Sequence, residues 1–222
     1  MLLLKNSKLT FGSLCIIVTA ILIAGCKVDF EIKDTDPKEE KLLNTRAMKD
    51  DFTSGFLSIK PKENNYLTFT SGTKGYKMLF HKDAIAQDFY YEKNDKHFER
   101  VVVTFGYKPD NLLIYQDTTY YDNEHLGANV DYLVESMQED LKGKKIKHFE
   151  DDEKEYYTGR LFEYHEEIPY SNFYAVIHSK KYKTKSVTFY GYGSCTDVKK
   201  TCNAKDERIE KHFNKILKSF KF

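Results

Sequence analysis

The distribution of apolar and charged positions divides the chain into two unequal parts. Residues 9–25 contain no charged side chain, Lys5 and Lys8 precede them, and the first acidic residue of the chain is Asp29. This apolar run of about 17 residues is short for a membrane-spanning helix of about 20 residues and suits the apolar core of an export signal. We therefore predict that residues 1–25 are a signal peptide and that the folded part of the chain follows later.

Two later segments repeat apolar residues at the spacing of an α-helix. The first is predicted from about Asn129 to Lys142, with Asn129 as N-cap, Lys142 near its end and Gly143 just beyond. The second is predicted from its N-cap Asn203 to about Ser219, with acids early and lysines late, as the helix dipole favours. The apolar stripes are Val130, Leu133, Val134, Met137 and Leu141 in the first helix, and Ile209, Phe213, Ile216, Leu217 and Phe220 in the second.

The rest of the pattern predicts short β-strands separated by turn residues. Pro61 is expected to end the first strand, and Asn94-Asp95 is expected to form the turn of a hairpin. For residues 51–222, strands and helices together predict a single α+β domain in which an antiparallel sheet is packed by the two helices. The predicted strands are 56–60, 66–69, 76–80, 89–91, 98–107, 112–115, 156–164, 173–179 and 186–192.

Composition agrees with a folded domain and argues against one class of partner. Of the 222 residues, 41% are hydrophobic and 15% aromatic, which is enough to build a core. Lys and Arg number 35 against 34 Asp and Glu, so the formal net charge is +1. That balance argues against a strongly basic nucleic-acid-binding protein. The 17 tyrosines and 16 phenylalanines favour strands.

The apolar run ends in Leu22-Ile23-Ala24-Gly25-Cys26. This segment resembles the lipobox of bacterial lipoproteins, in which an aliphatic residue and two small residues precede a cysteine, with Ile23 where Leu is commoner. The resemblance implies that the Cys26 thiol carries a diacylglycerol and that a signal peptidase cuts between Gly25 and Cys26. The new amino group can then be acylated, and two or more chains give stable anchoring where one does not. An uncleaved N-terminal anchor helix is the alternative.

The segment after the lipidated cysteine leaves two possibilities open. Residues 26–50 comprise Cys26 and a charged stretch that forms either a flexible tether or a short helix, in which Leu42, Leu43 and Met48 dock on the domain. Lys27 stands where an Asp is associated with retention in the inner membrane. The lipoprotein resemblance therefore implies a protein of the bacterial cell envelope, in the outer membrane if the cell has two membranes.

The four cysteines have separate predicted fates. Cys15 leaves with the signal peptide and Cys26 is lipidated, which leaves Cys195 and Cys202. In an exported domain, two remaining cysteines close in sequence predict one disulfide. Six intervening residues do not match the Cys-x-x-Cys redox motif, and no second pair of cysteines or nearby histidines supports zinc.

The order of the predicted elements is similar to that of the PsbP-like α/β/α sandwich. The residues that carry this resemblance are 56–61, a strand that runs into Pro61, and 216–222, the end of the last helix running into Ser219-Phe220. The aromatic residue that commonly follows the first proline in that family is not evident here. The resemblance implies the fold and little else, because the family is functionally diverse.

Catalytic and metal-binding patterns are weak in this sequence. It contains no Gly-x-Ser-x-Gly, His-Glu-x-x-His, P-loop or dinucleotide-binding motif. Gly191 to Cys195 resembles a nucleophile elbow without its closing glycine, and Ser194 is expected in a turn before the disulfide loop. His165-Glu166-Glu167 could supply metal ligands, but a solvated hairpin is the better interpretation, as is a solvated turn for the acidic run 150–153. We expect no cofactor, no metal and no enzymatic activity.

Three functions remain open at this stage. The leading hypothesis is a membrane-tethered, non-enzymatic module that binds a protein partner, of the immunity or assembly-accessory type. The alternative is a carrier of a small apolar or glycan ligand, held between sheet and helix. An envelope hydrolase that uses His165 or Ser194 is the third. Tyrosine pairs at 90–91, 120–121 and 156–157 could line a ligand groove or a partner surface, although alternating strand faces also explain many of them.

Overall fold

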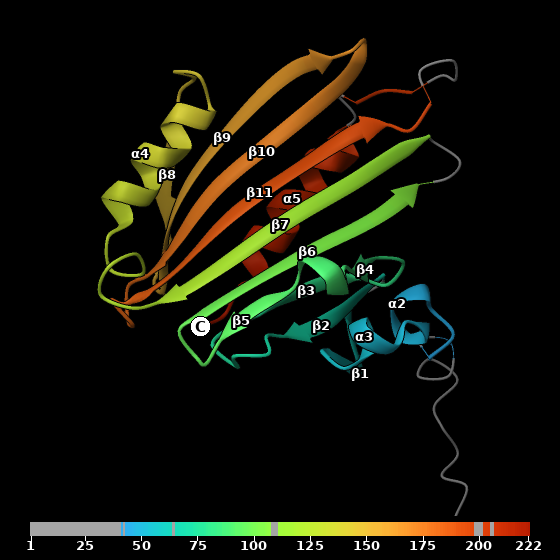
Figure 1. Cartoon of the computed structure of the whole chain (residues 1–222), viewed down its shortest axis with the longest axis horizontal. Helices are drawn as coiled ribbons and strands as arrows, with labels where there is room; N and C mark the ends of the chain where they lie inside the picture. Colours follow the sequence, from blue (N-terminus) through green and yellow to red (C-terminus); the bar gives the residue numbers. More distant parts are fainter. Residues whose placement is uncertain (1–40, 42, 64, 108–110, 198–201, 205–206) are drawn as a thin grey trace, which may run out of the picture. The chain divides into compact units, whose positions relative to one another are not determined.

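The computed structural model describes residues 41, 43–63, 65–107, 111–197, 202–204 and 207–222, and every structural statement below concerns these residues. The predicted signal peptide, Gly25 and Cys26 lie outside them. Nearly half of the described chain forms two antiparallel β-sheets that contribute to one hydrophobic core. Helices lie on both faces of the larger sheet (Figure 1).

The larger sheet has eight strands in the order β4-β6-β7-β11-β10-β9-β8, and β5 pairs with β6 beside this path. Neighbours in this order are antiparallel, and short connections of described residues join β8 to β9, β9 to β10 and β10 to β11. β7 and β11 are distant in sequence and form the centre of the sheet. The bounds are β4 Ile85–Ala86, β5 Glu92–Asn94, β6 Phe98–Tyr107, β7 Leu112–Asp122, β8 Lys147–Glu150, β9 Lys154–His165, β10 Ile168–Ser179 and β11 Lys185–Cys195.

The smaller sheet has the order β1-β2-β3. Its edge strand β1 covers Leu57–Glu63, so the prediction that this strand ends at Pro61 is wrong. The pairing with β2 shifts its register between Ser58 and Glu63. Prolines in sheets are found mainly on edge strands and at bulges, where the missing N–H removes no ladder hydrogen bond. The other strands are β2, Tyr66–Thr70, and β3, Lys77–His81.

The hairpin predicted at Asn94-Asp95 is confirmed, but its first strand differs. β5 pairs with β6, and Asp95 adopts a φ of 46° in the turn between them. The strand predicted at 89–91 is wrong, because Asp88–Tyr90 form a 3₁₀ helix, η1. Tyr91 packs against the rings of Phe52 and Phe56, whereas Phe89 is 90% exposed, so this aromatic run has no continuous face to bury in a sheet.

Several strands extend beyond their apolar patterns. β7 continues to Asp122 because its polar second half pairs with β6 on one side and β11 on the other. β10 begins at Ile168, and β11 continues to Cys195, so Ser194 lies within a strand and not in the predicted turn. The edge strand β8 was not predicted, and all four of its residues are exposed.

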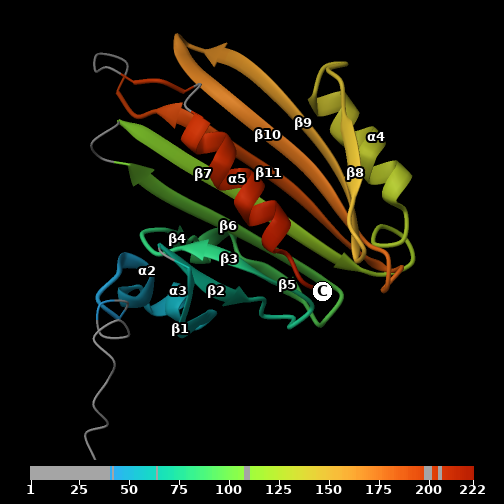
Figure 2. The ribbon, with the colours of Figure 1, turned by 180° about the vertical axis from the view of Figure 1, so that it is seen from behind.

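Helix α5, Glu207–Ser219, crosses one face of the larger sheet, with the smaller sheet beside it on the same face (Figure 2). Its predicted apolar stripe is confirmed. Residues 205–206 lie outside the described chain, so Asn203 as N-cap remains a prediction. The buried members of the stripe are Ile209, Phe213, Ile216, Leu217 and, just past the helix, Phe220.

Two glycines of β11 allow α5 to approach the sheet closely. A Cβ atom at Gly191 would lie 2.5 Å from the ring of Phe213, and one at Gly193 would lie 2.5 Å from Ile209. Real side chains do not tolerate such contacts. Gly191 and Gly193 therefore form the surface of β11 on which α5 packs.

Helix α4, Val130–Asp140, lies on the opposite face of the sheet, over the end formed by β9 and β10 (Figure 1). The predicted cap is present: the side chain of Asn129 accepts a hydrogen bond from the backbone N–H of Tyr132 at 3.3 Å. The predicted basic end is wrong, because Lys142 lies beyond the helix with a φ of 52° and its ammonium pairs with Glu163 of β9 at 2.5 Å. Leu133, Met137 and Leu141 are buried against the sheet, and Val130 and Val134 are partly buried.

The segment before the first strand contains two short helices that were not predicted as separate elements. These are α2, Arg46–Lys49, and α3, Asp51–Ser54, and Asp50 caps α3 through a 2.9 Å hydrogen bond from the backbone N–H of Thr53. Ala47 is fully buried and Met48 packs against the core, whereas Leu43 is 41% exposed. Of the two possibilities for this stretch, a docked short helix describes residues 46–49.

The expected mixed α+β class with an antiparallel sheet is confirmed. The smaller sheet and the helices α2 and α3 go beyond the sheet and two helices that the sequence suggested. Within the described part of the chain, no helix has both the length and the apolar character needed to cross a membrane.

Candidate functional site

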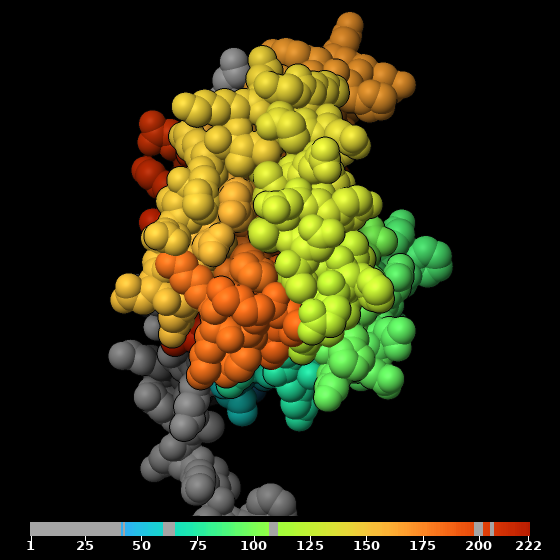
Figure 3. Space-filling model, turned by 90° about the vertical axis from the view of Figure 1, so that its left-hand side faces the viewer, coloured from blue at the N-terminus to red at the C-terminus, as the bar shows by residue number. Residues whose placement is uncertain are grey.

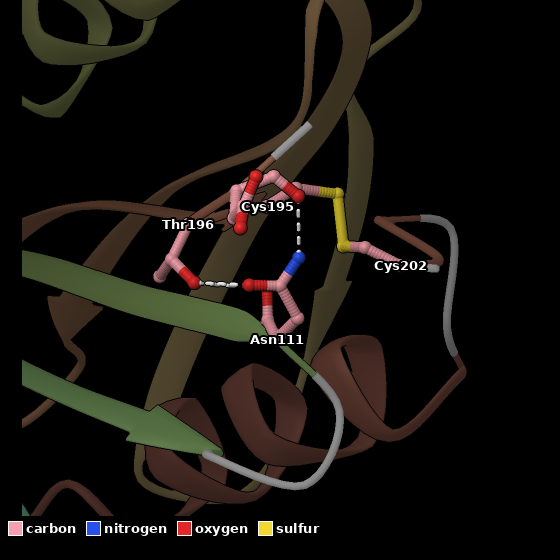
Figure 4. Close-up of a disulfide and its surroundings, with 5 residues drawn as sticks. Asn111, Cys195, Thr196 and Cys202 are labelled. Atoms are coloured by element: carbon pink, nitrogen blue, oxygen red, sulfur yellow. Dashed lines mark hydrogen bonds between the residues drawn. A yellow bond between two sulfur atoms is a disulfide. The ribbon is translucent and has the colours of Figure 1, made fainter. Parts of the chain in front are cut away.

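The predicted disulfide between Cys195 and Cys202 is present, with the two Cα atoms 5.8 Å apart (Figure 4). It ties the end of β11 to the segment that leads into α5. Asn111, at the start of β7, is held against the same segment. Its carbonyl oxygen accepts the backbone N–H of Thr196 at 3.0 Å, its amide donates to the carbonyl of Asp197 at 2.6 Å, and its side-chain oxygen accepts the Thr196 hydroxyl. These contacts give the disulfide a structural role at this end of the sheet.

The other candidate residues do not converge on a reaction centre. Ser194 is buried within β11, whereas His165 is exposed at the end of β9, and Glu166 and Glu167 form the following turn. Asp151 organises the acidic run as a turn, since its carboxylate accepts the backbone N–H groups of Glu153 and Lys154. No group of three or more His, Cys, Asp or Glu side chains among the described residues has the geometry of a metal site.

Two of the three tyrosine pairs singled out in the sequence separate between the two faces of the sheet, whereas the pair at 90–91 lies at the end of η1. Tyr120 and Tyr156 are buried in the core, and their neighbours Tyr121 and Tyr157 point to the opposite face. This follows from strand geometry, in which successive side chains alternate. Of these pairs, only Tyr121 lines the groove beside α4 that is described below.

Five other tyrosines form a continuous aromatic surface on the face of the sheet opposite α5. We call this surface the tyrosine platform. Its rings come from the adjacent strands β7, β11 and β10, and each is partly exposed. In Figure 1 none of the described helices lies over this part of the sheet. The members are Tyr115, Tyr170, Tyr174, Tyr190 and Tyr192.

The platform rings contact one another across the strands. Tyr115 and Tyr192 are stacked, with ring centroids 4.8 Å apart and planes 10° apart. Tyr170 meets Tyr192 edge-on at 5.3 Å, and Tyr174 lies 5.0 Å from Tyr190. Cross-strand aromatic pairs hold rings in fixed orientations, so the platform is a preformed surface.

The sequence of β11 explains why the platform forms where it does. In the run Tyr190-Gly191-Tyr192-Gly193, the glycines point toward α5 and the tyrosines toward the other face. The signal that could have located the platform is therefore a period-two alternation of tyrosine and glycine. Adjacent tyrosine pairs do not reveal this alternation.

Polar side chains adjoin the platform at fixed positions. The guanidinium of Arg100 binds both carboxylate oxygens of Asp117, with the shortest N–O distance 2.7 Å. Asn172 accepts the hydroxyl of Tyr190 at 3.0 Å and donates to Glu163 at 3.0 Å. These contacts hold charged and amide groups next to the rings without covering them.

A groove runs between the platform and α4, with a volume of about 360 Å³. We call it the α4 groove. Volumes of this size are typical of ligand pockets. Its floor includes Leu133, Met137 and Val176, and its walls carry many hydroxyls and two carboxylates. The polar lining residues are Asp117, Thr119, Tyr121, Tyr132, Ser136, Asp140, Tyr174, Thr188 and Tyr190.

The groove disfavours additional negative charge. Burial is the main cause that raises the pKa of Tyr174 to about 12, and the negative charges of Asp140 and Glu163 add to it. The pKa of Tyr121 is also raised, again chiefly by burial and further by the charge of Asp117. At neutral pH these phenols are uncharged hydrogen-bonding groups.

A second set of polar side chains lies in the core under α5. The imidazole of His212 is buried, and its Nδ1 is 2.9 Å from the hydroxyl of Tyr66. Its Nε2 has no hydrogen-bond partner among the described residues. Burial, with smaller contributions from His81 and Lys215, lowers the pKa of His212 to about 3. The rings of Phe105 and Phe213 contact His212, so these polar side chains contribute to the packing of α5 on the core.

Fold and site together define a class: an antiparallel α+β domain with one closed face and one open, aromatic face. A model of the family described as "Putative lipoprotein YvcA" matches residues 43–221, and the chain therefore belongs to that family. No curated protein and no solved structure matches the chain. Family membership supports a membrane-anchored lipoprotein of the cell envelope.

Proposed function

We propose that this lipoprotein is a non-enzymatic module that binds a protein partner at the envelope, of the immunity or assembly-accessory type. The observation that carries the proposal is the tyrosine platform. Tyrosine is enriched at the energetic centres of protein interfaces, and it supplies a large contact area with little loss of side-chain entropy. A preformed aromatic surface on an uncovered sheet face has the chemistry of such an interface.

The proposal includes the anchor and the domain organisation. A signal peptide at residues 1–25 is removed, Cys26 carries the acyl chains, the segment up to about residue 50 leads away from the membrane, and residues 51–222 form the binding domain. Lys27 favours the outer membrane in a cell with two membranes. The helices on opposite sheet faces agree with a PsbP-like sandwich, which stays our interpretation of the fold. Changing Cys26→Ser tests the anchor, since it is expected to abolish lipid labelling and membrane retention.

Crosslinking of the full-length protein in intact membranes tests the platform. We expect the double change Tyr115→Ala and Tyr192→Ala to reduce partner capture roughly tenfold or more, because aromatic hot spots contribute about 2 kcal/mol or more each. Tyr182→Ala is the matched control, since Tyr182 is 40% exposed in the turn between β10 and β11. Equal capture by both variants would contradict the proposal.

A glycan ligand is the second candidate, and the hydroxyl-rich lining of the α4 groove favours it. Tyrosine faces stack on sugar rings, and hydroxyls and carboxylates can bond to sugar hydroxyls. Binding of a defined oligosaccharide such as chitotetraose, lost on Tyr190→Ala and retained on Tyr182→Ala, would support this candidate over the protein partner.

The absence of enzymatic activity is likewise part of the proposal. Hydrolysis of an envelope substrate that is lost on either Ser194→Ala or His165→Ala would contradict it and revive the hydrolase hypothesis.

A further inference from the structure

Helix α4 carries an unusual charge distribution for a surface helix. Between Val130 and Asp140 it contains Asp131, Glu135, Glu139 and Asp140, and no Lys or Arg. Glu139 and Asp140 occupy the last turn, where the helix dipole is negative and favours cations. Acids at this end oppose the helix's own stability. Residues that break a local rule without an evident structural gain are candidates for function.

The position of Asp140 relates this charge to the α4 groove. Tyr132, Ser136 and Asp140 follow one another at intervals of four residues, and all three line the groove. The acids Asp131 and Glu135 lie on the adjacent row of the same helix. The side chain of Asp140 is exposed, and its carboxylate makes no hydrogen bond or ion pair with another described residue. Figure 3 shows α4 at the surface of the molecule.

The remainder of the lining does not neutralise this charge. No Lys or Arg occurs among the residues that line the groove in the described chain. Arg100, which lies outside the groove, pairs with the lining residue Asp117 and with Glu92. Lys142, which follows α4, is paired with Glu163. The groove therefore combines exposed carboxylate with partly exposed tyrosine rings.

We propose that the α4 groove receives a Lys- or Arg-rich segment of the partner protein, with a cationic side chain between Asp140 and the rings of Tyr132, Tyr174 and Tyr190. The inference rests on the proposed protein-binding function and names the chemistry of the partner. Arginine fits best, because its planar guanidinium can bind a carboxylate with two hydrogen bonds while stacking on an aromatic face. The acids on the adjacent helical row would attract the rest of a basic segment.

The experiment measures binding of a defined basic peptide to the full-length lipidated protein in neutral phospholipid nanodiscs. The probe is a fluorescein-labelled nonapeptide of alternating arginine and serine, followed by fluorescence anisotropy. We expect Asp140→Asn to weaken binding about threefold to tenfold, and the affinity of the unchanged protein to fall as salt is raised. Asp152→Asn is the matched control, since Asp152 is an exposed carboxylate in the loop between β8 and β9, outside the groove.

Three results would overturn the inference. The first is equal peptide affinity for the Asp140→Asn and Asp152→Asn proteins. The second is a groove that binds chitotetraose in an Asp140-dependent manner and shows no peptide binding above that of the same peptide with glutamate in place of arginine. The third comes from partner capture. Partner capture in membranes that depends on Tyr115 and Tyr192 but is unchanged by Asp140→Asn would refute the basic segment and still support the protein-binding function.

Discussion

The two faces of the larger sheet differ in how completely they are closed. On one face, α5 and the smaller sheet bury a core of phenylalanine, isoleucine and leucine side chains, and the glycines of β11 bring the helix close. On the other face, α4 covers the end of the sheet at β9 and β10 and leaves the tyrosine platform partly exposed. The charges of the helices differ in parallel: α5 has Glu207 and Glu210 first and Lys218 last, whereas α4 ends in two acids.

If the proposed function holds, this contrast places stability and recognition on opposite sides of the same strands. Alternating residues of β11 contribute to both, since Gly191 contacts the helix side and Tyr190 and Tyr192 form the platform. Changes under α5 should therefore act on folding, and changes on the platform or α4 should act on binding. The following predictions test that division, from the largest expected effect to the smallest.

Truncation of Phe213 is expected to cause the largest loss of stability. Its ring is fully buried against Phe173 and Phe189, and phenylalanine-to-alanine changes in cores cost about 3–5 kcal/mol. The free energy of unfolding, from urea titration, should fall by this amount for Phe213→Ala. Tyr192→Ala on the platform is the comparison and should cost much less. An equal loss of unfolding free energy for Phe213→Ala and Tyr192→Ala would contradict the division of roles between the two faces of the sheet.

Removal of the disulfide should come next in size. The bridge closes a short loop, and the chain-entropy estimate for such a loop is about 2–3 kcal/mol. The double change Cys195→Ser and Cys202→Ser should lower the free energy of unfolding by that amount and leave partner capture unchanged. Loss of capture without loss of stability would place a functional role at the disulfide end of the sheet.

Acidification should weaken the α5 face through His212. Its pKa is about 3 in the folded protein and near the usual 6.5 once unfolded, so below pH 6.5 the unfolded chain gains a proton that the folded chain does not. The stabilisation is fully present above pH 6.5 and declines by about 1.4 kcal/mol for each pH unit toward pH 3.

Between pH 7.5 and pH 5, the His212→Phe protein should therefore lose about 2 kcal/mol less than the unchanged protein, measured by urea unfolding at each pH. His125→Phe at an exposed turn is the control. If the free energy of unfolding changes with pH equally in the His212→Phe protein and the unchanged protein, the buried imidazole does not have the lowered pKa that the prediction requires.

The smallest expected effect is a gain. Asp140→Asn removes an acid from the negative end of the α4 dipole, which should raise the free energy of unfolding by about 0.3–1 kcal/mol at low salt. Thermal unfolding at low and high salt measures it, since screening should diminish the gain. A variant that is less stable would mean that Asp140 supports the fold rather than a partner.

Local patterns in the sequence predicted the two longer helices, α4 and α5, well because the information for each is contained within one segment. The stripes of α4 and α5 and the Asn129 cap depend on residues three and four positions apart. Strand ends depend on partners elsewhere in the chain. The polar half of β7 is a strand because β6 and β11 flank it, and β1 passes Pro61 because the ladder there is irregular.

The candidate site was harder to predict for the same reason. Adjacent tyrosines attract attention in a sequence, yet in a strand they lie on opposite faces. The platform unites Tyr115, Tyr174 and Tyr192 from three strands, and their register is fixed by pairing between distant segments. The alternation of tyrosine and glycine in β11 is a local signal for the platform in the sequence, but no prediction was made from it.

The close packing of α5 on Gly191 and Gly193 has one more consequence. Because β11 contacts the helix through Gly191 and carries the platform on its other side, movement of α5 would shift Tyr190 and Tyr192 together with the strand backbone. A partner bound to those rings, as proposed above, would therefore also stabilise the packing of α5 on the sheet. Binding of a partner to the tyrosine platform should then slow hydrogen exchange in α5, although α5 lies on the other face of the sheet.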